Sequence, residues 1–140
     1  MKVRSDLQEN LFAARAGILK AAKQKPAFIA LPEYFSVPNN MENFTSARDI
    51  SKETYKPTLN FLSEIGKEVP EPYIMGGTML EEDNGNFYNS STLWRGGKLI
   101  GKYRKVCLPH GEVRRAVYRR LRNPSKRVSA SRRDRCGALS

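Results

Sequence analysis

Residues 26–33 read PAFIALPE, and this segment decides the fold that the sequence predicts. An apolar run of five residues, 27–31, lies between the two prolines, and a run of this length is typical of a buried strand in an α/β sheet. Pro32 ends the strand because it has no backbone N–H to pair in the sheet. Glu33 is therefore expected just beyond the carboxyl end of a strand, where α/β proteins usually carry their functional groups.

Helical periodicity on either side of this strand predicts two helices. Residues 5–24 place apolar side chains on one face and begin with Ser5 and Gln8 at the spacing of a capping box. A second helix is expected over residues 51–67, with Pro57 tolerated only in its first turn. The positions expected to face the core are Leu7, Leu11, Ala14, Ile18, Ala22, Tyr55, Leu59, Leu62 and Ile65 or Gly66.

Three further strands are expected after the second helix. They cover residues 73–80, 87–94 and 99–108, which have the residue types and spacing of strands. Tight-turn signals join them, DNGN at residues 83–86 and RGGK at residues 95–98. The order helix, strand, helix and three strands predicts a mixed α/β layer with an antiparallel portion.

The basic charge is concentrated toward the C-terminal end. The chain has a net charge of +11 over 140 residues, and nine arginines fall between residues 114 and 135. We expect a folded domain over residues 1–112 and an irregular arginine-rich tail over residues 113–140, either disordered or an aberrant extension. The tail offers an alternative, non-enzymatic function, which is non-specific, salt-sensitive binding of nucleic acid or an anionic surface. Its aromatic content is limited to Tyr118, so sequence-specific base stacking is not expected.

Composition argues against several other classes of protein. No apolar run approaches the roughly 18 residues of a membrane span, and the N-terminus lacks the apolar core of a signal peptide, so we expect a cytoplasmic protein. The two cysteines, Cys107 and Cys136, and the one histidine, His110, are too few for a zinc site. We therefore expect no metal and no cofactor.

A second ionisable residue is expected at the end of a strand. The segment YRKVCLP, residues 103–109, places Lys105 there, and Lys102 is the competing lysine. A carboxylate and an ammonium at strand ends are two parts of a hydrolytic site, because the carboxylate moves protons and the ammonium stabilises developing negative charge. We expect Glu33 and Lys105 to converge in one pocket.

These segments resemble the signatures of the carbon–nitrogen hydrolase (nitrilase) superfamily. FIALPE at residues 28–33 is similar to the first signature, and FYNSS at 87–91 with GKLIGKYRK at 97–105 looks like the stretch that leads to the second. The similarity covers residues 5–112 in the family's order, which is the N-terminal half of its domain. It implies part of an α-β-β-α sandwich.

The resemblance also implies a chemistry. Family members hydrolyse amides, nitriles or carbamoyl groups with a Glu–Lys–Cys triad and no cofactor. By this resemblance Glu33 is the general base and Lys105 stabilises the oxyanion. Glu112 is implied as the second glutamate that often follows the lysine. The implied partners are a small-molecule amide or nitrile and, because family members commonly self-associate, a second copy of the chain.

The nucleophilic cysteine is where the sequence departs from the family. The family's cysteine follows an apolar strand well past the lysine. Here Cys136 follows an arginine-rich segment, and Cys107 lies two residues after Lys105, where many members have histidine. Loss of a nucleophile can cost on the order of 10⁶ in turnover. We therefore expect a chain that stops before the nucleophile and is inactive by itself, which leaves open whether it is an enzyme.

Overall fold

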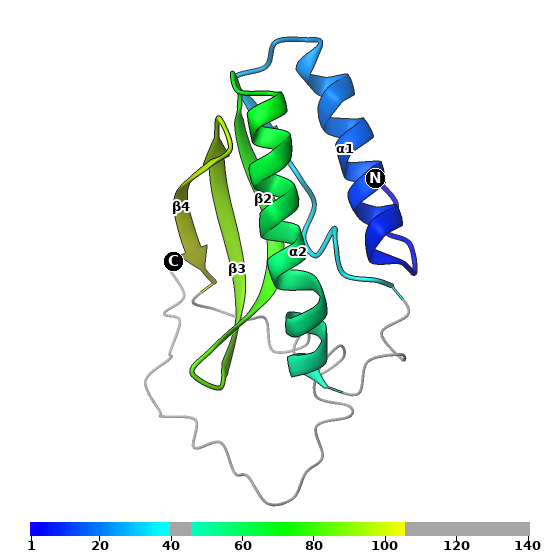
Figure 1. The fold of residues 1–140 in the computed structure, drawn as a ribbon, viewed down its shortest axis with the longest axis vertical. Coiled ribbons are helices and arrows are strands. Elements are labelled where there is room, and N and C mark those ends of the chain that lie inside the picture. The colour runs from blue at the N-terminus through cyan, green and yellow to red at the C-terminus, as the bar shows by residue number, and fades with distance from the viewer. Residues whose placement is uncertain (40–45, 106–140) are drawn as a thin grey trace, which may run out of the picture. The chain divides into compact units, whose positions relative to one another are not determined.

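The computed structural model describes residues 1–39 and 46–105, which form two helices and a four-stranded sheet (Figure 1). The elements, in chain order, are α1 (Leu7–Ala22), β1 (Phe28–Ala30), α2 (Ala47–Glu68), β2 (Tyr73–Asp83), β3 (Asn86–Arg95) and β4 (Lys98–Arg104). This confirms the predicted α/β class and the predicted order of elements. The proposed boundary at residue 112 and the arginine-rich tail lie outside the described residues.

The sheet is mixed, with the strand order β1-β2-β3-β4. β1 runs parallel to β2, and the β2–β3 and β3–β4 pairs are antiparallel. The carboxyl ends of β1, β2 and β4 therefore lie at the same edge of the sheet. Both predicted turns are present, and Asn84 (φ 51°), Gly85 (φ 79°), Gly96 (φ 55°) and Gly97 (φ 76°) have the left-handed backbone that two-residue hairpins require.

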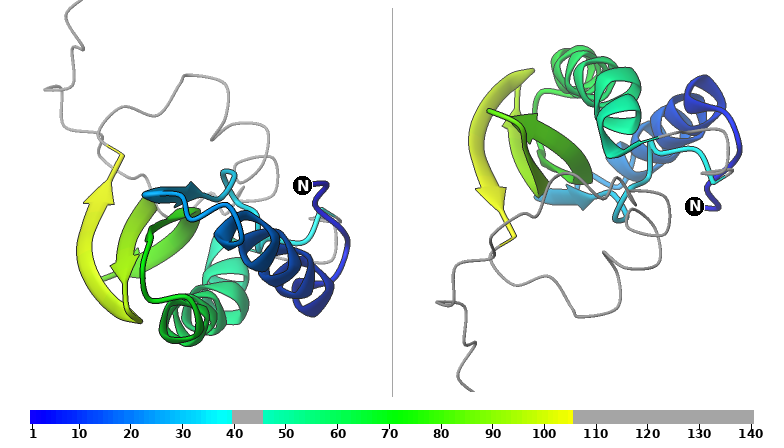
Figure 2. Two further views of the ribbon diagram at one scale, coloured as in Figure 1. Left: turned by 90° about the horizontal axis from the view of Figure 1, so that it is seen from above. Right: turned by 90° about the horizontal axis from the view of Figure 1, so that it is seen from below.

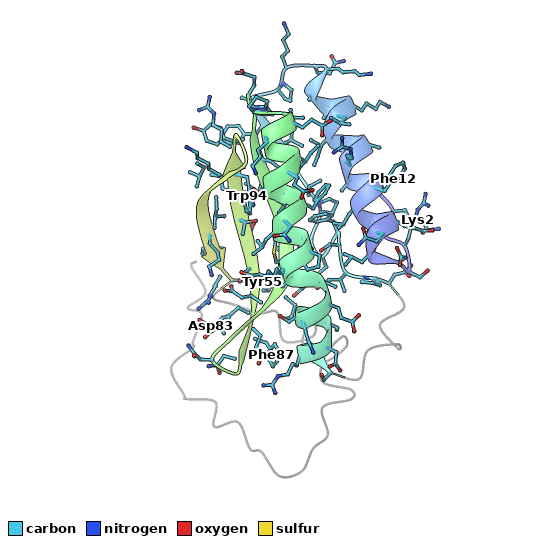
Figure 3. The ribbon with its side chains drawn as sticks, in the orientation of Figure 1. Lys2, Phe12, Tyr55, Asp83, Phe87 and Trp94 are labelled. Atoms are coloured by element: carbon cyan, nitrogen blue, oxygen red, sulfur yellow. The ribbon has the colours of Figure 1, made fainter. Side chains whose placement is uncertain are left out.

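Both helices pack on one face of the sheet, which we call the helix face (Figure 2). Figure 3 shows Trp94 and Tyr55 between α2 and the sheet, while Phe12 of α1 points away from it. The side not packed against these helices is called the opposite face. The core of the helix face consists of Ile18, Ile29, Leu62, Ile65, Ile74, Met79 and Trp94.

α2 also holds the turn between β3 and β4. The Ser63 hydroxyl donates to the Gly97 carbonyl at 2.9 Å. Gly66 lies so close to this turn that a Cβ added to it would be 2.8 Å from the Gly97 nitrogen. The β3–β4 turn is therefore attached to a helix, although its sequence resembles that of an ordinary surface hairpin.

The predicted start of α1 was wrong by one residue. Asp6, and not Ser5, is the N-cap, and its side chain accepts from the Glu9 backbone N–H at 2.9 Å. A carboxylate satisfies the open N–H groups at a helix start and also interacts favourably with the helix dipole. The predicted buried face is confirmed at Leu11, Ala14 and Ile18.

α2 is longer than predicted, and the expectation for its proline was wrong. The helix begins after the N-cap Ser46, so Pro57 lies in its interior and not in its first turn. An interior proline costs about 3 kcal/mol because it removes a backbone hydrogen bond. The buried side of α2, which includes Leu62 and Ile65, packs on the sheet, and packing of this kind outweighs local propensity.

β1 is not the fully buried strand that was predicted. It pairs only with β2 among the described strands, and Ile29 is its one buried residue, whereas Phe28 is 61% exposed. The Phe28 ring stacks on Tyr73 with the ring centroids 5.1 Å apart. Ile29 and Leu31 of the apolar run therefore contact the core, whereas Phe28 lies on the opposite face. This is the result of the two-residue period of a strand.

Candidate functional site

Glu33 lies where β1 gives way to an irregular segment. It forms an isolated parallel bridge with Thr78 of β2, and the next residue, Tyr34, donates its backbone N–H to the Thr78 carbonyl at 2.9 Å. The segment approaches β2 closely because Gly77 has no side chain. A Cβ added at Gly77 would lie 2.1 Å from the Pro32 carbonyl oxygen. Pro32 and Gly77 thus fix the backbone that carries the carboxylate.

Lys105 directly follows β4. Its backbone N–H donates to the Asn89 carbonyl at 2.9 Å, which continues the β3–β4 pairing one residue beyond Arg104. Lys105 is therefore held by the sheet on its backbone side. Its ammonium is carried on a long side chain that can reach across the sheet.

The strand register decides which side chains share a face. Ser90 of β3 pairs with Met79 of the helix-face core on one side and with Arg104 on the other. Side chains alternate along a strand, so Asn89 and Ser91 point to the opposite face. The residues of β2, β4 and the adjoining segments that share this face with them are Glu33, Thr78, Leu80, Tyr103 and Lys105.

The predicted convergence of Glu33 and Lys105 is present in the structure. Lys105 Nζ lies 3.5 Å from Glu33 Oε1, although β2 and β3 separate the two backbones. Adjacent strands lie about 4.8 Å apart, so the two side chains cross much of the width of the sheet to meet. The Glu33 side chain is 52% exposed and that of Lys105 is 30% exposed. The pair is thus accessible to a small molecule.

The competing lysine, Lys102, is committed to a different carboxylate. Lys102 Nζ lies 2.6 Å from Glu81 Oε1, and Arg104 Nη2 lies 2.8 Å from the same oxygen. Ser90 also donates to Glu81, whose side chain is only 5% exposed. These residues belong to the helix face. Lys105 is therefore the lysine of β4 and its extension that meets Glu33.

The cluster around Glu81 has strongly shifted protonation equilibria. Hydrogen bonds from Arg104, with smaller contributions from Lys102 and Ser90, lower the pKa of Glu81 to about 2 against the opposing effect of burial. Burial, followed by the negative charge of Glu81, raises the pKa of Tyr55 to about 12. Sequence analysis missed this cluster. The sequence does contain an acidic run at residues 81–83 and a basic end of β4. Only the strand register shows that the two segments lie side by side.

Three residues of the sequence-based hypothesis cannot be placed. Glu112, Cys107 and Cys136 lie outside the described residues, so their roles stay predictions. Within residues 1–39 and 46–105, no three His, Cys, Asp or Glu side chains come together as a metal site would require. No helix in that part of the chain is long and apolar enough to cross a membrane.

Known proteins match the chain over most of its length. The family model described as carbon-nitrogen hydrolase matches residues 1–138. "Hydrolase C26A3.11" of Schizosaccharomyces pombe is 35% identical over 104 residues, which are 74% of this chain and 32% of that protein. Human "Omega-amidase NIT2" is 34% identical over 110 residues, which are 77% of this chain and 38% of that protein. The chain thus spans about a third to two fifths of the length of these relatives.

Solved structures give the same result for the fold. Saccharomyces cerevisiae Nit3, a member of branch 10 of the nitrilase superfamily, superimposes with a TM-score of 0.62 and 32% identity, over 76% of this chain and 41% of that chain. A carbon-nitrogen hydrolase from Helicobacter pylori superimposes with a TM-score of 0.66 and 16% identity, over 79% of this chain and 38% of that chain. With a family model, relatives and folds in agreement, this chain belongs to the carbon-nitrogen hydrolase family of the nitrilase superfamily.

Proposed function

We propose that this chain supplies the general base and the oxyanion-stabilising cation of an amidase-type site, with Glu33 as the base and Lys105 as the cation. The observation that carries the proposal is the 3.5 Å approach of the two charged groups from separate strand ends on the opposite face of the sheet. The amide class of substrate is supported by the similarity to omega-amidase. Glu112 is proposed as a second carboxylate of the same site.

Each group has a defined task in amide hydrolysis. A cysteine thiol adds to the amide carbon while Glu33 accepts the thiol proton, which then passes to the departing nitrogen. Water cleaves the resulting thioester, with Glu33 accepting a proton from the water. In both steps the Lys105 ammonium stabilises the negative charge on the substrate oxygen, an effect that is typically worth about 3–4 kcal/mol per donor.

We further propose that the chain has no turnover by itself, because neither Cys107 nor Cys136 lies in the setting of the family nucleophile. The opposite face of the sheet is the surface on which a complementary layer would pack. Phe28, Met75 and Tyr103 are exposed apolar residues there, and buried sheet faces are built from such side chains. These exposed apolar residues are also the surface through which we propose that two copies of the chain would associate.

Ammonia release from small primary amides tests the two parts of the proposal. The chain alone should give none above background. Addition of a polypeptide that comprises the remaining, cysteine-containing part of human omega-amidase NIT2 should give turnover. Glu33→Gln and Lys105→Met should then each reduce the turnover by about 10³-fold or more.

The matched control is Glu53→Gln, because Glu53 is an exposed glutamate of α2. This variant should leave the turnover unchanged. Turnover by the chain alone that survives Glu33→Gln would contradict the proposal. The alternative of a basic tail that binds nucleic acid concerns residues outside the described ones, and it stays a prediction together with the cytoplasmic location.

A further inference from the structure

Asn89 is a buried side chain without hydrogen-bond partners. It is 4% exposed, and neither Nδ2 nor Oδ1 has a partner. Buried polar groups in folded proteins are almost always paired, because an unpaired group loses its bonds to water without replacement. The unpaired carboxamide of Asn89 therefore needs an explanation beyond packing.

Asn10 shows what a structural asparagine looks like in the same molecule. It is fully buried, its Oδ1 accepts from the Arg4 backbone N–H at 2.7 Å, and its Nδ2 donates to the Arg4 carbonyl at 3.2 Å. Both polar atoms of Asn10 thus fix the chain before α1. The side-chain atoms of Asn89 fix no part of the chain in this way. Only its backbone carbonyl has such a role, because it accepts a hydrogen bond from the Lys105 N–H.

The position of Asn89 connects it to the proposed site. It lies on the opposite face of the sheet, directly between Leu80 of β2 and Lys105. The adjacent row on this face runs from Glu33 through Thr78 to Ser91. Leu80, Asn89 and Lys105 form one row of paired residues across the strands, and Glu33 belongs to the adjacent row. The Lys105 side chain therefore extends from its own row to the adjacent one to reach Glu33. Asn89 thus lies on the face of the sheet that the ion pair crosses.

The chemistry of a carboxamide complements that of the two charged groups. A Glu33 carboxylate only accepts hydrogen bonds and a Lys105 ammonium only donates them, whereas Asn89 does both. A primary amide also carries a donor and an acceptor side by side, so two carboxamides form two parallel hydrogen bonds. A secondary amide in its usual trans form cannot do so, because its N–H points away from its carbonyl oxygen.

We propose that Asn89 is a substrate-binding residue of the site, where its Nδ2 donates to the carbonyl oxygen of a primary amide and its Oδ1 accepts from the amide N–H. This rests on the proposed function and adds a substrate preference to it. Primary amides are bound better than N-alkylated amides. The unpaired state of Asn89 is then the state that awaits the substrate.

The first test compares two buried asparagines in the full chain. In urea unfolding, Asn10→Leu should lower the midpoint because it removes two hydrogen bonds. Asn89→Leu should leave the midpoint unchanged or raise it, since an unpaired polar group is replaced by an apolar one of similar size. A fall in the midpoint of Asn89→Leu equal to that of Asn10→Leu would show a structural role and overturn the proposal.

The second test follows ligand binding by NMR. Propionamide should shift the side-chain amide signals of Asn89 in a saturable way, together with the signals of the Lys105 ammonium and the Glu33 carboxyl. N-methylpropionamide should bind about tenfold more weakly, as should propionamide to Asn89→Leu, because two neutral hydrogen bonds are lost. The side chain of Asn60, exposed on α2, is the internal control and should not respond.

The outcomes separate this inference from the function on which it rests. If Glu33 and Lys105 respond to propionamide but Asn89 does not, the role of Asn89 is wrong and the proposed site stands. If none of the three residues responds, both are wrong. Equal binding of the two amides would overturn the preference for primary amides.

Discussion

The two faces of the sheet carry the same kind of pair, a glutamate with a basic residue of the β4 end, in opposite environments. On the helix face, Glu81 is 5% exposed and has Lys102 and Arg104 within 2.6 and 2.8 Å. On the opposite face, Glu33 is 52% exposed and lies 3.5 Å from Lys105. The basic partners are consecutive residues, because Arg104 pairs with Glu81 and Lys105 pairs with Glu33. The difference shows that environment, and not residue type, separates the buried ion pairs of Glu81 from the exposed pair of Glu33.

The energetic reason lies in what each carboxylate loses on folding. Glu81 is removed from water, so its oxygens need the donors that Lys102, Arg104 and Ser90 provide. Glu33 remains in contact with water, and exposed pairs contribute only about 0–1 kcal/mol to stability. Separation of Lys105 from Glu33 would therefore cost the fold at most about 1 kcal/mol, whereas the Glu81 carboxylate needs its donors for the fold to be stable.

The largest effect is expected from breaking the pair on the helix face. Glu81→Gln removes the charge that compensates Lys102 and Arg104. We expect a loss of up to about 3 kcal/mol, less than for a fully buried pair, because these two basic side chains are about a third exposed and Arg104 keeps its ion pair with Asp83. Urea unfolding at neutral pH measures this loss. Glu53→Gln on the exposed side of α2 should change the free energy of unfolding by less than about 0.5 kcal/mol. Similar values for the two variants would remove the distinction between the faces.

Acid should weaken the same cluster without a mutation. The pKa of Glu81 falls from 4.5 to about 2 on folding, so the ionised carboxylate stabilises the fold at neutral pH. This contribution, on the order of 3 kcal/mol, is retained above the unfolded pKa and is lost as the pH falls toward the folded pKa. Urea unfolding from pH 6 to pH 2 should show the decline. In Glu81→Gln the decline should be smaller by this amount, and an identical pH dependence would contradict the assignment.

A somewhat smaller effect is expected where the chain supports Glu33. Gly77→Ala would place a Cβ in the Pro32 carbonyl at a φ of +61°, and strain of this kind costs about 1–3 kcal/mol. Gly85→Ala is the matched control, because its φ is +79° with nothing within 4 Å of the added Cβ. Gly77→Ala should be the more destabilising variant by urea unfolding. It should also shift the NMR signals of Glu33, and Gly85→Ala should not.

The smallest effect is expected from breaking the pair on the opposite face. Glu33→Gln and Lys105→Met should each change the free energy of unfolding by less than about 1 kcal/mol, because the pair is partly exposed and long. The same variants should reduce turnover by about 10³-fold or more in the assay with the complementary polypeptide. A loss of stability as large as that of Glu81→Gln would mean that this pair is structural.

The local features of the fold could be predicted from the sequence. Pro32 ends β1 and positions Glu33 beyond it, and the DNGN and RGGK segments form the two hairpin turns. These outcomes depend on backbone chemistry within a few residues, which sequence determines directly. Lys105 was preferred over Lys102 because it directly precedes Val-Cys-Leu-Pro in the segment YRKVCLP, and the ion pairs agree with this choice.

The features that sequence did not reveal depend on contacts between distant segments. Pro57 is tolerated inside α2 because of packing against the sheet, and Phe28 is exposed because β1 is buried on one face only. The Glu81 cluster requires the register of three strands. The unpaired state of Asn89 is a property of its surroundings in three dimensions and has no signature in the sequence.

The attachment of the Gly96–Gly97 turn to α2 limits which insertions and deletions the protein can tolerate during evolution. The side chains of Arg104 and Lys105 point to different faces of the sheet. Lengthening or shortening the turn by a single residue would move every side chain of β4 to the other face, so that Arg104 and Lys105 would exchange faces. The hydrogen bond from Ser63 and the close approach of Gly66 fix the position of the turn against α2 and thereby the register of β4. We therefore expect descendants of this fold to accept insertions readily at the Asn84–Gly85 tip, but to keep the length of the other hairpin constant.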